Sequence, residues 1–135
     1  KPHPHEPDCK EFFERIAKQV GAKRFHILED DLYKLLAYCD VVMIYNSTVG
    51  AEAIYFKKPL VVMNYAENDF SGFIDSGVAN EVNDYEMLQA IIGKSKALAA
   101  ITDVAAQEAF IKERAYKIDG QVSERIIKTV RKQAH

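Results

Sequence analysis

The stretch Asp40–Asn64, "DVVMIYNSTVGAEAIYFKKPLVVMN", decides the fold of this chain. It holds two apolar runs, Asp40–Tyr45 and Pro59–Asn64, that show no polar alternation. Continuous runs of this kind are typical of parallel strands covered on both faces. Between them, Ala51–Phe56 predicts a short helix. This strand–helix–strand order predicts a parallel α/β sheet with right-handed crossovers.

The rest of the chain continues the alternation. Further strands are predicted at Arg24–Leu28 and Val78–Asn83, and Lys1–His3 would be the stub of a fifth. Helices are expected after Asp8, after Asp30 or Asp31, after Asp84, over Val104–Ile118 and from Val122 onward. Residues 1–135 are therefore predicted to form one Rossmann-like domain, with four to five parallel strands, flanking helices and a helical C-terminus.

Composition excludes several functional classes. The chain has 48% hydrophobic and 28% charged residues and a net charge of −2, so no global basic field attracts nucleic acid. Its longest apolar runs fall short of a membrane span, and the two cysteines are expected to be free thiols, which together favour a cytoplasmic protein. A weak contact with a membrane surface is conceivable only at the basic run Lys128–Gln133.

A polar corner separates the two apolar strands. In an open parallel sheet, ligands bind beyond the carboxyl ends of the strands, which is where Ser47 and Thr48 stand. Their hydroxyls and the start of the following helix suit a phosphate, and Gly50 would let a ligand approach the backbone. Glu52, about 6 Å further along the helix axis, would accept hydrogen bonds from a ribose diol. Asn64, at the end of the next strand, is placed to contact a base or sugar.

Each of these residues also has an interpretation without a ligand. Ser and Thr are common helix caps, and a glutamate in a first turn is stabilised by the helix dipole. His3 could be a solvated terminal residue. The N-terminal histidines, Glu6 and Cys9 resemble a metal cluster, but the prolines spread the segment and no second ligand group follows, so no metal site is predicted.

The segment Asp31–Tyr65, "DLYKLLAYCDVVMIYNSTVGAEAIYFKKPLVVMNY", resembles the C-terminal, donor-binding half of GT-B-fold glycosyltransferases. The matching positions are Ser47, Thr48, Glu52-Ala53 and Lys58-Pro59. Together with the N-terminal "KPHP", they are most similar to capsule and surface-polysaccharide glycosyltransferases. The resemblance implies a CMP- or UDP-linked sugar as donor substrate, no separate cofactor, and a donor phosphate held by His3, Ser47 and Thr48.

The resemblance leaves other functions open. It is shared with UDP-N-acetylglucosamine 2-epimerases and with glycerophosphate polymer transferases, and a non-catalytic binding module could keep the same fold. Relative to the family pattern, the acceptor domain and the first strand and helix of this half are missing. A partner domain or chain is therefore expected, the catalytic base is not identified, and an unpaired sheet edge would allow self-association.

Overall fold

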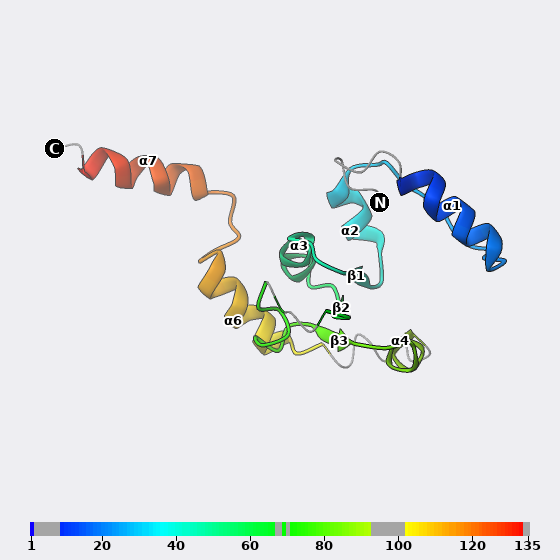
Figure 1. The fold of residues 1–135 in the computed structure, drawn as a ribbon. Helices are drawn as coiled ribbons and strands as arrows, with labels where there is room; N and C mark the ends of the chain where they lie inside the picture. The colour runs from blue at the N-terminus through cyan, green and yellow to red at the C-terminus, as the bar shows by residue number, and fades with distance from the viewer. Residues whose placement is uncertain (2–8, 67–68, 70, 93–101, 134–135) are drawn as a thin grey trace. The chain divides into compact units, whose positions relative to one another are not determined.

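The computed structural model describes residues 1, 9–66, 69, 71–92 and 102–133 (Figure 1). The chain divides into two compact units, Lys1–Tyr38 and Cys39–His135. Among the described helices, none is both long enough and apolar enough to cross a lipid bilayer.

The first unit contains two helices joined by an irregular segment. α1 covers Cys9–Gln19 and α2 covers Leu32–Tyr38. The predicted strand Arg24–Leu28 is wrong, because the structure assigns no strand between these helices. A strand needs a neighbour to pair with its backbone, and the described part of this unit offers none. Phe25 and Leu28 accordingly stay 40% and 49% exposed.

The ends of these helices were partly predictable. Asp31 begins α2 as expected, because its carboxylate accepts a hydrogen bond from the backbone N–H of Lys34 at 3.1 Å. The proposed strand stub Lys1–His3 and the proposed cap Asp8 lie outside the described residues.

The second unit is built on a parallel sheet. Its strands are β1 (Val42–Ile44), β2 (Leu60–Met63) and β3 (Asn80–Val82), in the spatial order β1-β2-β3. Val42 pairs with Leu60, and Val61 pairs with Asn80. The α/β class, the parallel sheet and the helical C-terminus are confirmed. The described sheet has three strands rather than four or five, since the segment before α2 does not join it.

Two helices cover the two faces of this sheet. α3 (Val49–Tyr55) follows β1, and α4 (Tyr85–Ile92) follows β3. An apolar cluster joins one face to α4, and its members are Val41, Val61, Val82, Leu88 and Ile91. α3 packs on Ile44, which pairs with Val62, the residue after Val61. Since successive side chains of a strand point to opposite faces, α3 and α4 lie on opposite sides.

Two further helices complete the unit. α6 (Val104–Arg114) begins at Asp103, whose carboxylate accepts from the N–H of Ala106, and α7 covers Val122–Gln133. α6 contacts α3, and the buried Gln107 donates a hydrogen bond to the carbonyl of Lys58 at 3.2 Å. The helix predicted over Val104–Ile118 therefore exists but ends four residues earlier.

Candidate functional site

Ser47 and Thr48 form the corner between β1 and α3. The Ser47 Oγ accepts a hydrogen bond from the N–H of Val49 at 3.3 Å, so it closes the first turn of the helix. A hydroxyl can accept and donate at once, so the Ser47 proton remains available to a ligand. Thr48 has helical backbone angles, φ −66° and ψ −14°, and its side chain makes no capping bond. Its exposed hydroxyl is therefore not explained by helix capping.

The backbone at this corner is already engaged. The N–H of Gly50 donates to the Ser47 carbonyl at 3.3 Å, and that of Ala51 donates to the Thr48 carbonyl at 2.9 Å. The N–H groups of Gly50 and Ala51 are therefore not open to an anion at the start of α3. Contact with an anion at this corner would rest mainly on the two hydroxyls.

Glu52 is the least satisfied group of the corner. It is half-buried, and its Oε2 is closed off from solvent without a hydrogen-bond partner among the described residues. Leaving a buried charged acceptor unpaired costs more than the roughly 1–3 kcal/mol typical of a neutral group. Glu52 and Thr48 are four residues apart, so they share one face of α3. The buried face of the same helix carries Gly50, Ala53 and Ile54.

One other described side-chain oxygen is buried without a partner, the Oε1 of Gln107. It belongs to a neutral amide whose nitrogen is satisfied by the Lys58 carbonyl. Glu52 differs because it is a carboxylate and because a hydroxyl stands one turn before it on the same face.

Gly50 has a packing role. A Cβ built on it would lie 2.5 Å from the Cε2 of Phe73 and 2.9 Å from the Cδ1 of Ile44. The absence of a side chain lets α3 approach the sheet and the Phe73 ring. Packing alone therefore explains why a glycine stands at position 50. The predicted contact between Gly50 and a donor stays a prediction.

Asn64 follows β2 and is buried. Its Nδ2 donates to the Glu81 Oε1 at 2.7 Å, and its backbone N–H donates to the Val82 carbonyl at 2.8 Å. With its amide turned the other way, Asn83 also donates to the Glu81 Oε1, at 3.1 Å. These contacts tie the carboxyl ends of β2 and β3 together, so Asn64 has a structural partner. Its predicted contact with a base or sugar is not tested by them.

Glu81 was missed by the sequence reasoning. A charged residue inside the short strand Asn80–Val82 was the available signal, since a carboxylate there needs a polar neighbour. Asn64 is that neighbour, but it lies 17 residues earlier and only the folded sheet joins the two.

Asp69 organises the loop after β2. Its carboxylate accepts hydrogen bonds from the N–H groups of Phe73, Ile74 and Asp75 at 3.1, 2.8 and 2.9 Å. This holds the buried Phe73 ring in place beside α3. Asp69 therefore has a structural role in this loop.

The remaining predictions concern His3, a metal site and the two cysteines. His3 lies outside the described residues. Within the described part of the chain, no group of three or more His, Cys, Asp or Glu side chains could hold a metal ion. Neither Cys9 nor Cys39 forms a disulfide bond in the described structure.

Comparison with known protein families gives a match over most of the chain. Residues 1–116 match a family model described as "Capsule polysaccharide biosynthesis protein". The matched region ends just after α6. No curated protein and no solved structure matches the sequence.

Proposed function

This chain belongs to the capsule polysaccharide biosynthesis family, and on that premise we propose that its second unit binds the nucleotide-sugar donor of a glycosyltransferase. Membership gives the chain a role in capsule synthesis. The finer assignment, to donor binding, is supported by the chemistry of the corner between β1 and α3.

The observation that carries the proposal is the Glu52 carboxylate. Its Oε2 is buried without a partner, while Thr48 offers an uncommitted hydroxyl one turn earlier on the same helix face. A nucleotide presents a phosphate and, one sugar ring away, two neighbouring hydroxyls. The ribose hydroxyls would donate to the Glu52 carboxylate if its side chain turns outward to meet them, and the phosphate would accept from Ser47 and Thr48.

In this proposal the protein acts by stabilising the leaving group. When the sugar–phosphate bond breaks, negative charge develops on the nucleotide phosphate. Hydroxyl donors at that position favour the charged product, and the Ser47 oxygen is held there before reaction by the hydrogen bond that it accepts from the Val49 N–H. Glu52 is a positioning residue, since it holds the ribose and does not touch the reacting atoms.

The proximity of Glu52 to a phosphate carries an electrostatic penalty. Two unit charges about 6 Å apart repel by about 0.7 kcal/mol in water and about 3 kcal/mol at an effective dielectric constant of 20. Two hydrogen bonds from ribose to a carboxylate contribute about 1.5–3 kcal/mol each. Glu52 therefore strengthens nucleotide binding when both ribose hydroxyls are present. It does not strengthen the binding of a phosphate that lacks ribose.

That difference defines the experiment. Calorimetry with CMP and UMP, repeated with their 2′,3′-dideoxy forms, compares the unaltered chain with Glu52→Gln. We expect Glu52→Gln to weaken ribonucleotide binding about tenfold, equivalent to about 1.4 kcal/mol. It should leave dideoxynucleotide binding unchanged or slightly tighter, because the repulsion is removed. Glu86→Gln, in the exposed first turn of α4, is the matched control and should change neither.

The outcomes separate the competing functions. If Glu52→Gln lowered the affinity for ribonucleotides and dideoxynucleotides equally, the ribose contact would be contradicted. If the unaltered chain bound no nucleotide, a non-catalytic module would be favoured. If donor binding holds, the choice between transferase and 2-epimerase rests on the product. Release of free nucleotide that depends on an acceptor glycan supports the transferase.

A further inference from the structure

α7 carries an apolar stripe that the described structure leaves open. Its four large aliphatic side chains are 48–60% exposed, namely Val122, Ile126, Ile127 and Val130. Their spacing of four, one and three residues places them on one face of a helix. Burying such side chains stabilises by about 1.5–3 kcal/mol each, so a stripe of four strongly favours a partner surface.

The charge around this stripe differs from that of the rest of the chain. From Lys117 onward the sequence holds five cations and two anions, a net charge of +3, while the whole chain carries −2. The preceding 116 residues therefore carry −5. The basic part begins directly after the region that matches the family model, residues 1–116. Charge asymmetry of this kind indicates an anionic partner for the basic end.

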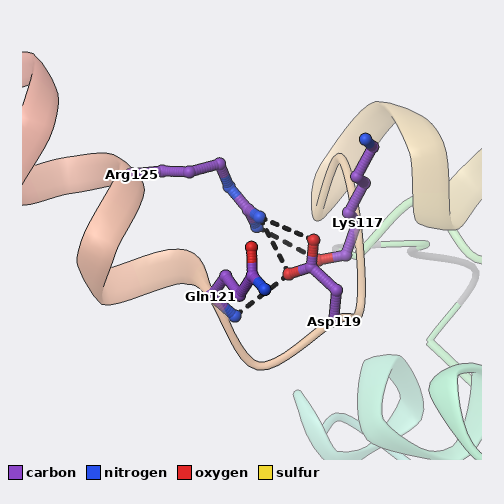
Figure 2. A network of polar contacts seen from close by, with 4 residues as sticks. All are labelled: Lys117, Asp119, Gln121 and Arg125. Atoms are coloured by element: carbon purple, nitrogen blue, oxygen red, sulfur yellow. Dashed lines mark hydrogen bonds and ion pairs between the residues drawn. The ribbon is translucent and has the colours of Figure 1, made fainter.

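A polar network holds the start of α7 (Figure 2). Both carboxylate oxygens of Asp119 accept from the Arg125 guanidinium at 2.8 Å, and its Oδ1 accepts from the N–H of Gln121 at 3.0 Å. This pairing neutralises Arg125 within the chain. The cations left for an external partner on α7 are Lys128, Arg131 and Lys132, against the single anion Glu124.

We propose that α7 docks on an anionic membrane surface, lying in the plane of the lipid headgroups. An apolar stripe bordered by lysine and arginine is the pattern that binds such interfaces. At about 1.5 Å per residue, its 12 residues span about 18 Å, too short to cross the roughly 30 Å hydrocarbon core but sufficient to lie on it. Anionic headgroups contribute about 1 kcal/mol per nearby cation.

Two other occupants fit the surface less well. The α7 of a second copy of the chain would cover the stripe. It would, however, place three cations of one helix against three cations of the other, with a single glutamate on each helix. A nucleic acid would complement the charge and leave the four aliphatic side chains without an apolar partner. The lipid surface satisfies both the stripe and its basic border.

The chain contains no tryptophan, so Ile127→Trp introduces a single fluorescent reporter into the stripe. The full chain is mixed with vesicles of pure phosphatidylcholine or of equal parts phosphatidylcholine and phosphatidylglycerol. We expect a blue shift and co-sedimentation with the anionic vesicles, and little of either with the neutral ones. Raising the salt concentration should weaken binding, because it screens the headgroup charge.

Matched variants assign the effect to α7. Lys128→Gln with Lys132→Gln should weaken co-sedimentation about 25-fold, from about fivefold per cation removed. Ile126→Ser should weaken it about tenfold through lost apolar contact. The controls are Val104→Ser, at a side chain 52% exposed, and Lys112→Gln, both on α6, and neither should alter binding. Circular dichroism verifies that all variants fold.

Several results would overturn the proposal. Equal binding to neutral and anionic vesicles, or equal losses in the α6 controls, would remove the role of α7. A concentration-dependent dimer in solution that Ile126→Ser dissociates would assign the stripe to a second copy. Displacement of the chain from vesicles by a short duplex DNA at low concentration would assign the basic border to nucleic acid. The proposal is independent of donor binding, which is measured without lipid.

Discussion

Replacing Gly50 by alanine adds one methyl group, which has two opposing effects on the stability of the protein. Alanine is a better helix former than glycine by about 1 kcal/mol. In this helix, however, the added Cβ would meet the Phe73 ring at 2.5 Å and Ile44 at 2.9 Å. Overpacking of this kind typically costs about 1–3 kcal/mol. We expect Gly50→Ala to lower the free energy of unfolding by about 1 kcal/mol net, measured by urea denaturation.

The control for this prediction is a second change at the obstructing ring. Phe73→Leu alone leaves a cavity and should destabilise the protein, yet combined with Gly50→Ala it should recover part of the loss. Strictly additive effects of the two changes would show that the contact between α3 and the ring does not limit stability.

Lys57 ends α3 in a backbone conformation that favours glycine. Its φ is +54°, and the N–H groups of Lys57 and Lys58 donate back to the carbonyls of Ile54 and Ala53, each at 2.9 Å. A non-glycine residue there costs about 1–2 kcal/mol, partly offset by glycine's greater freedom in the unfolded chain. Lys57→Gly should raise the free energy of unfolding by about 0.5 kcal/mol in thermal or urea unfolding.

Lys57→Ala separates backbone strain from the side chain. It removes the exposed ion pair with Glu108 (3.8 Å) but retains the left-handed strain, so it should give no gain in stability. If alanine stabilised as much as glycine, the lysine side chain and not its φ angle would be responsible.

Individual site residues were predictable where their environment is local in sequence. Ser47, Thr48 and Glu52 lie within six residues, so the strand-to-helix pattern alone brings them to one corner. The buried state of the Glu52 Oε2 and the Asn64–Glu81 bond were not predictable, because they depend on packing between segments distant in sequence. The hydrogen bonds of the Gly50 and Ala51 N–H groups were not predictable either, since the sequence pattern does not specify the backbone angles of this tight turn.

At the scale of elements, two of the predicted strands had different outcomes. Asp40–Tyr45 contains β1, because β2 supplies a parallel partner in register. Arg24–Leu28 is also predicted as a strand, but the described part of its unit offers no partner, and it remains irregular. Strand propensity measures how well a residue fits an existing sheet, so it could not distinguish the two runs.

The junction between α6 and α7 has a pH dependence that can be measured. The hydrogen bond from Arg125 is the main cause that lowers the pKa of Asp119 below its ordinary 3.8, followed by the Gln121 N–H. A lowered folded-state pKa means that the contact stabilises above pH 3.8 and is lost as the pH falls further. Carbon-13 NMR of the Asp119 carboxyl should therefore show a midpoint below 3.8.

Two variants rank the causes of that shift. Arg125→Gln should raise the Asp119 midpoint more than Lys117→Gln, because Lys117 acts only through space whereas Arg125 donates hydrogen bonds. A larger effect from Lys117 would mean that the Arg125 contacts in Figure 2 do not persist in solution. Because the junction is exposed, we expect local fraying of α7 at low pH and no global unfolding.

For the whole molecule, the sequence pattern predicted the α/β class and the parallel sheet but not the division into two units. The class follows from hydrophobic periodicity, which is local. The division depends on which contacts form between segments, and periodicity carries no information about that. The family match spans described parts of both units.

The Phe73 ring described above lies beside Gly50 and 5.7 Å from the Phe110 ring. A loop, the β1–α3 corner and α6 thus share one aromatic side chain. A larger side chain at position 50 should therefore be tolerated best when the side chain at position 73 is smaller, and a change at position 73 alters the packing against Phe110. Positions 50, 73 and 110 should therefore covary among homologues. A sequence alignment of relatives would test this expectation without mutagenesis.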